Sequence, residues 1–155
     1  MTQKIKPCLW FDGNGQEAAE FYVSVFKDQG DSGITTVTPG PNGAALVVAF
    51  RLAGVEFLAL NGGPQFRFNE AVSLSVDCRS QEELDELWEK LSAGGSGGQC
   101  GWLKDRYGLS WQIVPSVLPR LLAGEVPARA GRVMNALMGM TKLDIRALEA
   151  AADAG

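Results

Sequence analysis

The residue types that most often do acid–base and nucleophilic chemistry are scarce in this sequence, because its 155 residues include no histidine. That absence removes Ser-His-Asp and Cys-His catalysis and histidine-based zinc sites. Cys100, followed by Lys104 and Asp105, is the one set of residues that points to nucleophilic chemistry. A nearby ammonium group lowers a thiol pKa, but no residue stands ready to act as the base. Cys100 is therefore the candidate catalytic residue, and Asp105 is more plausible as a turn residue.

The three cysteines, Cys8, Cys78 and Cys100, form an odd count and have no Cys-x-x-Cys spacing. This pattern argues against a disulfide framework and against a zinc knuckle. We interpret them as buried or half-buried thiols that act as small hydrophobic groups.

A segment near the end of the sequence, residues 100–115, has the pattern of a hairpin that could form the wall of a pocket. Its centre is an Asp-x-x-Gly turn, and the strand predicted over residues 109–114 alternates in polarity. Leu109, Trp111 and Ile113 would lie on one face, and Ser110 and Gln112 on the other.

Ligand pockets are mostly apolar and aromatic, with a few placed polar groups. The candidate ligand-binding residues that fit this description are Trp10, Phe57, Ser73, Ser75, Trp102, Trp111 and Gln112. A second interpretation is equally open, in which the tryptophans fill the core and the two serines face solvent.

The elements expected to position these residues repeat along the chain. The first copy, residues 4–61, reads as a strand over 4–11, a helix over 16–26, and strands over 33–38, 44–52 and 55–61. The second copy, residues 71–114, begins with a strand over 71–77 and a capping box at Ser80–Glu83 that starts a helix. Strands over 99–104 and 109–114 follow, and the first strand after the helix is hard to discern. We therefore predict an α+β fold of two βαβββ modules within residues 1–115.

Residues 116–155 have no counterpart in this repeat. Their periodicity predicts helices over 117–122, 128–140 and 142–152, which we assign to the same domain. This extension is apolar and contains three methionines, so it is expected to pack on its own sheet or on a partner subunit. We expect a homodimer.

Composition restricts the partners. The net charge is −4, with no basic stripe, which disfavours nucleic-acid binding. No apolar run approaches the roughly 20 residues that span a bilayer, and the amino terminus lacks the pattern of a signal peptide. We expect a cytoplasmic protein that acts on neither membranes nor nucleic acids.

Four long segments of the sequence resemble a known protein family. The runs CLWFDGNGQEAAEFYVSVF, GGPQFRFNEAVSLSVDC, WEKLSAGG and CGWLKDRYGLSWQIVPSVLPRLL resemble the PhnB-like branch of the vicinal oxygen chelate superfamily, which includes glyoxalase I, bleomycin-resistance proteins and extradiol dioxygenases. This branch is often labelled "3-demethylubiquinone-9 3-methyltransferase domain". The resemblance covers nearly the whole chain and implies a cupped mixed sheet around a cavity, commonly in a dimer.

The metal site of the superfamily does not carry over. Metal-using relatives place ligands, typically His and Glu, at four strand positions. Those positions fall at Ile5 or Pro7, near Phe57, near Ala71 and at Gln112. Because Gln112 alone offers a side-chain ligand, we predict no metal and no cofactor. The methyltransferase label also finds no support in the pattern of elements, since a conventional S-adenosylmethionine enzyme would read as a doubly wound α/β fold.

Two functions follow. The first is a small-molecule binding protein without the usual metal site. The alternative is an enzyme that acts on a small metabolite, either glyoxalase- or dioxygenase-like or the methyltransferase of the label, through atypical ligands or Cys100.

Overall fold

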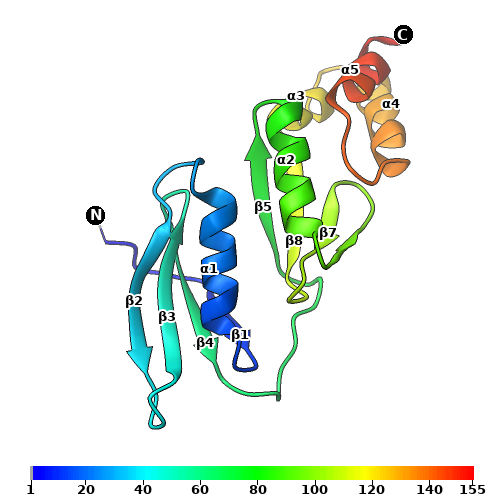
Figure 1. The fold of residues 1–155 in the computed structure, drawn as a ribbon. Coiled ribbons are helices and arrows are strands. Elements are labelled where there is room, and N and C mark those ends of the chain that lie inside the picture. The colour runs from blue at the N-terminus through cyan, green and yellow to red at the C-terminus, as the bar shows by residue number, and fades with distance from the viewer. Residues whose placement is uncertain (1) are drawn as a thin grey trace. The chain divides into compact units, whose positions relative to one another are not determined.

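A computed structural model describes residues 2–155, and it divides into two compact units, Met1–Phe68 and Asn69–Gly155 (Figure 1). Each unit contains a βαβββ module with a four-stranded mixed sheet. The internal duplication and the α+β class predicted from the sequence are confirmed.

The first unit is built from β1 (Cys8–Phe11), α1 (Gly15–Phe26), β2 (Gly33–Pro39), β3 (Ala45–Leu52) and β4 (Val55–Asn61). The strand order is β1-β4-β3-β2, with β1 parallel to β4 and the other pairs antiparallel. The first strand is shorter than predicted from residues 4–11. Pro7, just before it, has no N–H to donate, although its carbonyl oxygen still accepts a hydrogen bond from Leu58 N at 2.9 Å.

One face of the first sheet packs against α1. Because side chains alternate along a strand, Phe50 and Phe57 point toward the helix, where their rings stack with centroids 5.5 Å apart. Tyr22 from α1 is fully buried and stacks on Phe50. The aromatic stripe of the helix is therefore core, and it leaves the opposite face of the sheet free of this helix.

The second unit repeats the pattern with β5 (Ser73–Cys78), α2 (Gln81–Ser92), β6 (Ser96–Gly97), β7 (Trp102–Lys104) and β8 (Ser110–Pro115). Its strand order is β5-β8-β7-β6, and β5 runs parallel to β8 as β1 does to β4. The strand that was hard to discern from the sequence is β6, which has only two residues. A segment of two residues is too short to show the alternation of polar and apolar side chains that identifies a strand.

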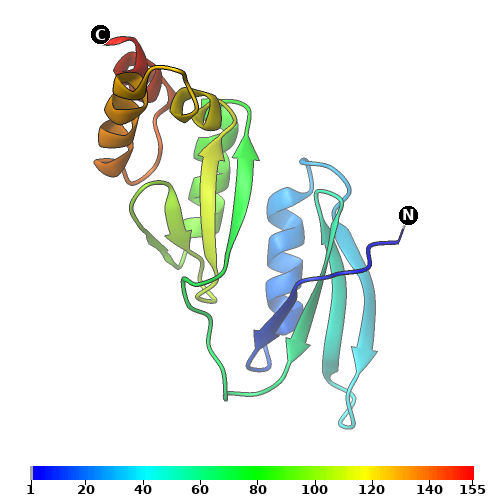
Figure 2. The same ribbon diagram turned by 180° about the vertical axis from the view of Figure 1, so that it is seen from behind.

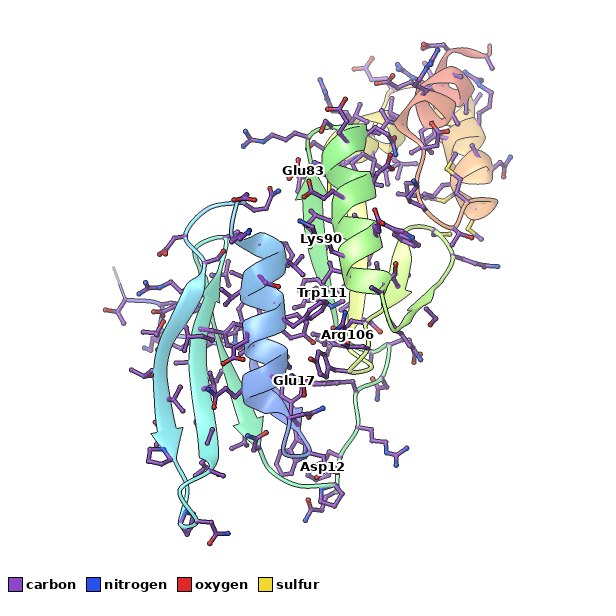
Figure 3. All side chains as sticks on the ribbon, viewed as in Figure 1. Asp12, Glu17, Glu83, Lys90, Arg106 and Trp111 are labelled. Carbon is purple, nitrogen blue, oxygen red and sulfur yellow. The ribbon has the colours of Figure 1, made fainter. Side chains whose placement is uncertain are left out.

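Helix α2 begins at the predicted capping box, but the reciprocal bond from the Glu carboxylate is shifted by one residue, from the N-cap Ser80 to Arg79. Ser80 Oγ accepts a hydrogen bond from Glu83 N, and the Glu83 carboxylate accepts one from Arg79 N at 2.9 Å. Leu84, Leu87 and Leu91 form the buried face of this helix. Glu83 and Lys90 lie on α2 in Figure 3, away from that apolar face.

The hairpin between β7 and β8 is held by one buried carboxylate. Asp105, only 3% exposed, accepts hydrogen bonds from Tyr107 N, Leu109 N and Trp111 Nε1 at 2.8, 3.1 and 2.9 Å. Gly108 completes the turn with a φ of 88°. Asp105 is thus the turn residue predicted from the sequence.

Three helices follow β8 and belong to the second unit: α3 (Leu118–Leu122), α4 (Pro127–Met138) and α5 (Ile145–Asp153) (Figure 2). Gln81 ties α5 to α2, because its amide donates to Leu143 O and accepts from Ile145 N. The helix predicted from residue 142 begins later because Asp144 caps it, accepting from Ala147 N at 3.1 Å. In the part of the chain that the structure describes, no helix has the length and apolarity to span a membrane.

Candidate functional site

The face of the second sheet that points away from α2 gathers most of the predicted polar site residues. In the strand register Ser73 pairs with Ser110, Ser75 with Gln112, and Trp102 with Gln112. Paired residues project to the same side of a sheet, so these five side chains share one face, here called the open face. Ser73, Ser75, Trp102 and Gln112 were predicted as site residues, and the structure brings them together.

Gln112 and Ser73 are joined by a direct hydrogen bond. Gln112 Nε2 donates to Ser73 Oγ at 2.9 Å, and both side chains are half-buried. This bond fixes the amide orientation and leaves Gln112 Oε1 as an acceptor. Ser75, one pleat further along β5, is exposed.

A cavity of about 240 Å³ is lined in part by Trp102 and Ser110 of the open face. Its lining residues are Glu70, Ser96, Gly98, Trp102, Leu103, Lys104 and Ser110. Ser110 is 1% exposed, and its hydroxyl has no hydrogen-bond partner among residues 2–155. A buried hydroxyl without a partner is destabilising by about 1–3 kcal/mol, so Ser110 is a polar residue of the cavity wall whose hydrogen bond is missing within the described chain.

An ion pair forms another part of the cavity wall. Lys104 Nζ contacts the Glu70 carboxylate, and each side chain is about half exposed, at 47% and 57%. The hydrogen bond from Lys104 lowers the pKa of Glu70. Glu70 is therefore charged near neutral pH, and it already has Lys104 as a partner of opposite sign.

Two predicted site residues lie in the core instead. Trp111 is 2% exposed on the face of β8 that α2 covers, where its indole N–H bonds Asp105 (Figure 3). Phe57 is 7% exposed beneath α1. Neither can line the open face of its own sheet, because strand alternation points both toward a helix. For Trp111 the core-filling interpretation holds.

Trp10 lies in the first unit and is half-buried. Its indole N–H donates to Gly63 O at 2.8 Å, and its ring meets Phe66 edge-on with centroids 4.9 Å apart. A Cβ on Gly62 would come within 2.4 Å of this ring. Trp10 therefore holds the loop after β4 against the sheet.

Cys100 occupies a strained turn next to the C-terminal helices. Its φ is 60°, its amide donates to Met140 O, and its sulfur lies 3.8 Å from Met138 Sδ. A thioether is a weak hydrogen-bond acceptor and no base. Lys104, which the sequence suggested as an activating cation, is paired with Glu70. These contacts give Cys100 a packing role.

Two polar residues near the candidate site, Ser110 and Glu56, were not among the predicted site residues. Ser110 was predicted to lie on the polar face of its strand but was not included among the site residues. The available signal was its position two residues before Gln112, which puts both side chains on the same face. Glu56 was overlooked in favour of its neighbour Phe57. It is paired with Lys6 at 3.6 Å and Arg51 at 3.4 Å, and its Oε2 is buried without a hydrogen bond.

The residues present do not fit the divalent ion that metal-using relatives hold. On the open face, Gln112 and Ser73 are neutral and bonded to each other, and Lys104 brings a positive charge. In the first unit, Glu56 already lies between two cations. Across residues 2–155, no cluster of three or more His, Cys, Asp or Glu side chains offers a metal site.

Two βαβββ modules with mixed four-stranded sheets define the vicinal oxygen chelate fold of the glyoxalase and bleomycin-resistance proteins. Residues 3–114 match the family model described as 3-demethylubiquinone-9 3-methyltransferase, and the chain belongs to that family. No curated protein matches this chain.

Solved structures agree with this assignment. A protein from Bacillus cereus described as a putative 3-demethylubiquinone-9 3-methyltransferase, PhnB protein, is 32% identical, with a TM-score of 0.67 over 73% of this chain and 99% of that one. Protein PA1353 from Pseudomonas aeruginosa is 20% identical over 74% and 98% of the two chains, with a TM-score of 0.59.

A more distant neighbour is the fosfomycin resistance protein FosX from Listeria monocytogenes, in complex with Mn(II) and sulfate. It is 19% identical, with a TM-score of 0.51 over 72% of this chain and 89% of that one. At this identity the likeness shows the fold alone. The family match and these three structures all leave residues of this chain uncovered.

Proposed function

We propose that this protein binds a small molecule on the open face of its second sheet, without a metal ion. The observation that carries the proposal is the buried, unpartnered Ser110 hydroxyl in the wall of the 240 Å³ cavity. Burying a hydroxyl without a hydrogen bond is unfavourable, and a ligand acceptor would remove that penalty. The functional conclusion is a binding protein rather than a methyltransferase.

The cavity wall supports a ligand with an aromatic ring and a neutral polar group. Trp102 is half-buried and offers an apolar ring surface, while Ser110 offers a hydroxyl donor. Lys104 and Glu70 satisfy each other, so the site does not require a charged ligand. Its volume is below the roughly 300–1,000 Å³ of pockets for drug-sized molecules. The expected ligand is therefore a small metabolite.

Native mass spectrometry of the purified full chain, with elemental analysis of the same sample, is the first experiment. We expect no stoichiometric divalent metal and, where a ligand survives purification, an added mass that denaturation releases. One divalent ion per chain that survives dialysis would contradict the proposal and favour the enzyme alternative.

A fragment screen by two-dimensional NMR then tests the site itself. Benzamide and related aromatic amides should shift the resonances of Ser110, Gln112 and the Trp102 indole, and Ser110→Ala should weaken binding about threefold to tenfold. Ser24→Ala, which removes an exposed hydroxyl on α1, is the matched control and should change nothing. Equal binding by both variants would contradict the proposed role of Ser110.

The expected homodimer is part of this proposal. Exposed apolar side chains on and near α4, namely Val126, Met134 and Met138, support an association between copies of the chain. The same native mass spectra measure the oligomeric state, and a monomer at micromolar concentration would contradict it.

A further inference from the structure

The three C-terminal helices line a second, open cavity, which lies outside the family match to residues 3–114. Its volume is about 430 Å³, within the range of ligand pockets. The lining residues come from the segment before α3, from α3, from α4 and from α5, and they are Val117, Arg120, Leu121, Arg129, Glu149 and Asp153. This set combines two cations, two carboxylates and two aliphatic side chains.

Among the cavity residues that the structure describes, Arg129 lacks a hydrogen-bond partner for a buried donor. Its Nε is buried, yet within residues 2–155 it finds no hydrogen-bond acceptor. By contrast, Arg132, one turn later on α4, has acceptors for its guanidinium group. It donates hydrogen bonds to Ala151 O at 3.0 Å and to Ala152 O at 2.9 Å. A guanidinium group has five N–H donors in a planar fork that matches a carboxylate. The free fork of Arg129 is thus a ready site for a carboxylate ligand.

The opposite charge is supplied by α5. Glu149 and Asp153 are four residues apart, so they lie on the same face of the helix, where two like charges repel. In the described part of the chain, neither carboxylate forms an ion pair with Arg120 or Arg129, although all four residues line the same cavity. A cation placed between the two carboxylates would relieve their repulsion.

A simple anion would satisfy Arg129 but would also meet these two carboxylates. A simple cation would satisfy the carboxylates but would meet the two arginines. A molecule with both charges satisfies both sides, and Val117 and Leu121 offer apolar surface to its remaining atoms. Leu121 is buried, so its side chain forms part of the fixed wall of the cavity.

We propose that this cavity binds a zwitterionic amino carboxylate of the size of an amino acid or dipeptide. Its carboxylate contacts Arg129 and Arg120, its ammonium group contacts Glu149 and Asp153, and its aliphatic part packs on Val117 and Leu121. The site is independent of the open face of the second sheet, and it gives residues 116–155 a binding function of their own.

The test titrates three matched compounds into the full-length, ¹⁵N-labelled protein and follows the amide resonances of α3, α4 and α5. L-leucine carries both charges. 4-Methylpentanoate lacks the ammonium group, and 3-methylbutylamine lacks the carboxylate. We expect leucine to bind at least about tenfold more tightly than either analogue, because each analogue loses one set of charge-assisted hydrogen bonds.

Two variants connect this selectivity to named residues. Arg129→Gln should weaken leucine binding at least about tenfold, while Arg146→Gln, an exposed arginine of α5 outside the cavity, should leave it unchanged. Glu149→Gln should narrow the preference for leucine over 4-methylpentanoate. Far-UV circular dichroism and the thermal midpoint of each variant establish that the helices remain folded.

Three outcomes would overturn the proposal. The first is the absence of any leucine-dependent shift in the amide resonances of α3, α4 and α5 at leucine concentrations of about 10 mM, at which even a weak site is occupied. The second is equal binding of leucine and its two analogues. The third is unchanged leucine affinity in a folded Arg129→Gln variant.

Discussion

The buried contact between Asp105 and Trp111 gives the sharpest stability prediction. Their side chains are 3% and 2% exposed, and Trp111 Nε1 donates to Asp105 Oδ2 at 2.9 Å. The other oxygen, Oδ1, accepts from Tyr107 N and Leu109 N. In an Asp105→Asn variant, either orientation of the amide leaves an N–H donor facing another N–H donor. We expect a loss of about 3 kcal/mol, from a missing charged hydrogen bond and an unpaired buried donor.

A Trp111→Phe variant removes the indole donor and part of the ring volume. We expect it to be destabilised by about 3 kcal/mol as well, from the lost bond and the cavity left behind. In the double variant the amide no longer faces the indole N–H. The combined loss should therefore be about 4 kcal/mol rather than about 6, which is a coupling energy of about 2 kcal/mol.

Urea unfolding of the full-length chain, followed by far-UV circular dichroism, measures these values without depending on tryptophan fluorescence. Asp12→Asn is the matched control, because Asp12 is exposed in the turn before α1, and its change should stay within about 0.5 kcal/mol. If the two single losses add to within about 0.5 kcal/mol in the double variant, then the bond between Asp105 and Trp111 does not stabilise the hairpin as argued.

Two further predictions concern a thiol and a glycine. Burial and the nearby carboxylates raise the pKa of Cys78 to about 12, so a thiol reagent at pH 8 should label the other two cysteines and spare this one until the protein unfolds. Because this folded pKa exceeds the ordinary value of 9.0, the stability linked to the neutral thiol should be fully present below pH 9 and decline between pH 9 and 12. Gly62→Ala should destabilise the first unit by about 1–3 kcal/mol in urea unfolding, because the new methyl group would overlap the Trp10 ring. Gly33→Ala, where a Cβ meets no atom within 4 Å, is the control, and equal losses in the two variants would contradict the overlap argument.

The elements and the duplication were predictable because they follow from local periodicity. Alternation along residues 109–114 was enough to assign Ser110 and Gln112 to one side of a strand and Trp111 to the other. The capping box at Ser80 located the start of α2 correctly. Strand β6 escaped prediction because two residues carry no period.

The candidate sites depended on information that no local pattern contains. Alternation says which side chains share a face, but not which face a helix will cover, and α2 covers that of Trp111 while α1 covers that of Phe57. The packing of the elements around the sheet also decided that the Ser110 hydroxyl is buried without a hydrogen-bond partner among the described residues.

The C-terminal cavity illustrates the same limit. The sequence by itself determined that helices follow residue 115, but the last predicted helix, 142–152, ended before Asp153, so no sequence pattern placed Glu149 and Asp153 on one face. Only the tertiary structure brought that face together with Arg120 and Arg129, which are 20 or more positions away along the chain. Charges so far apart in sequence meet through the packing of whole helices, and that packing is set by the core rather than by the charges themselves.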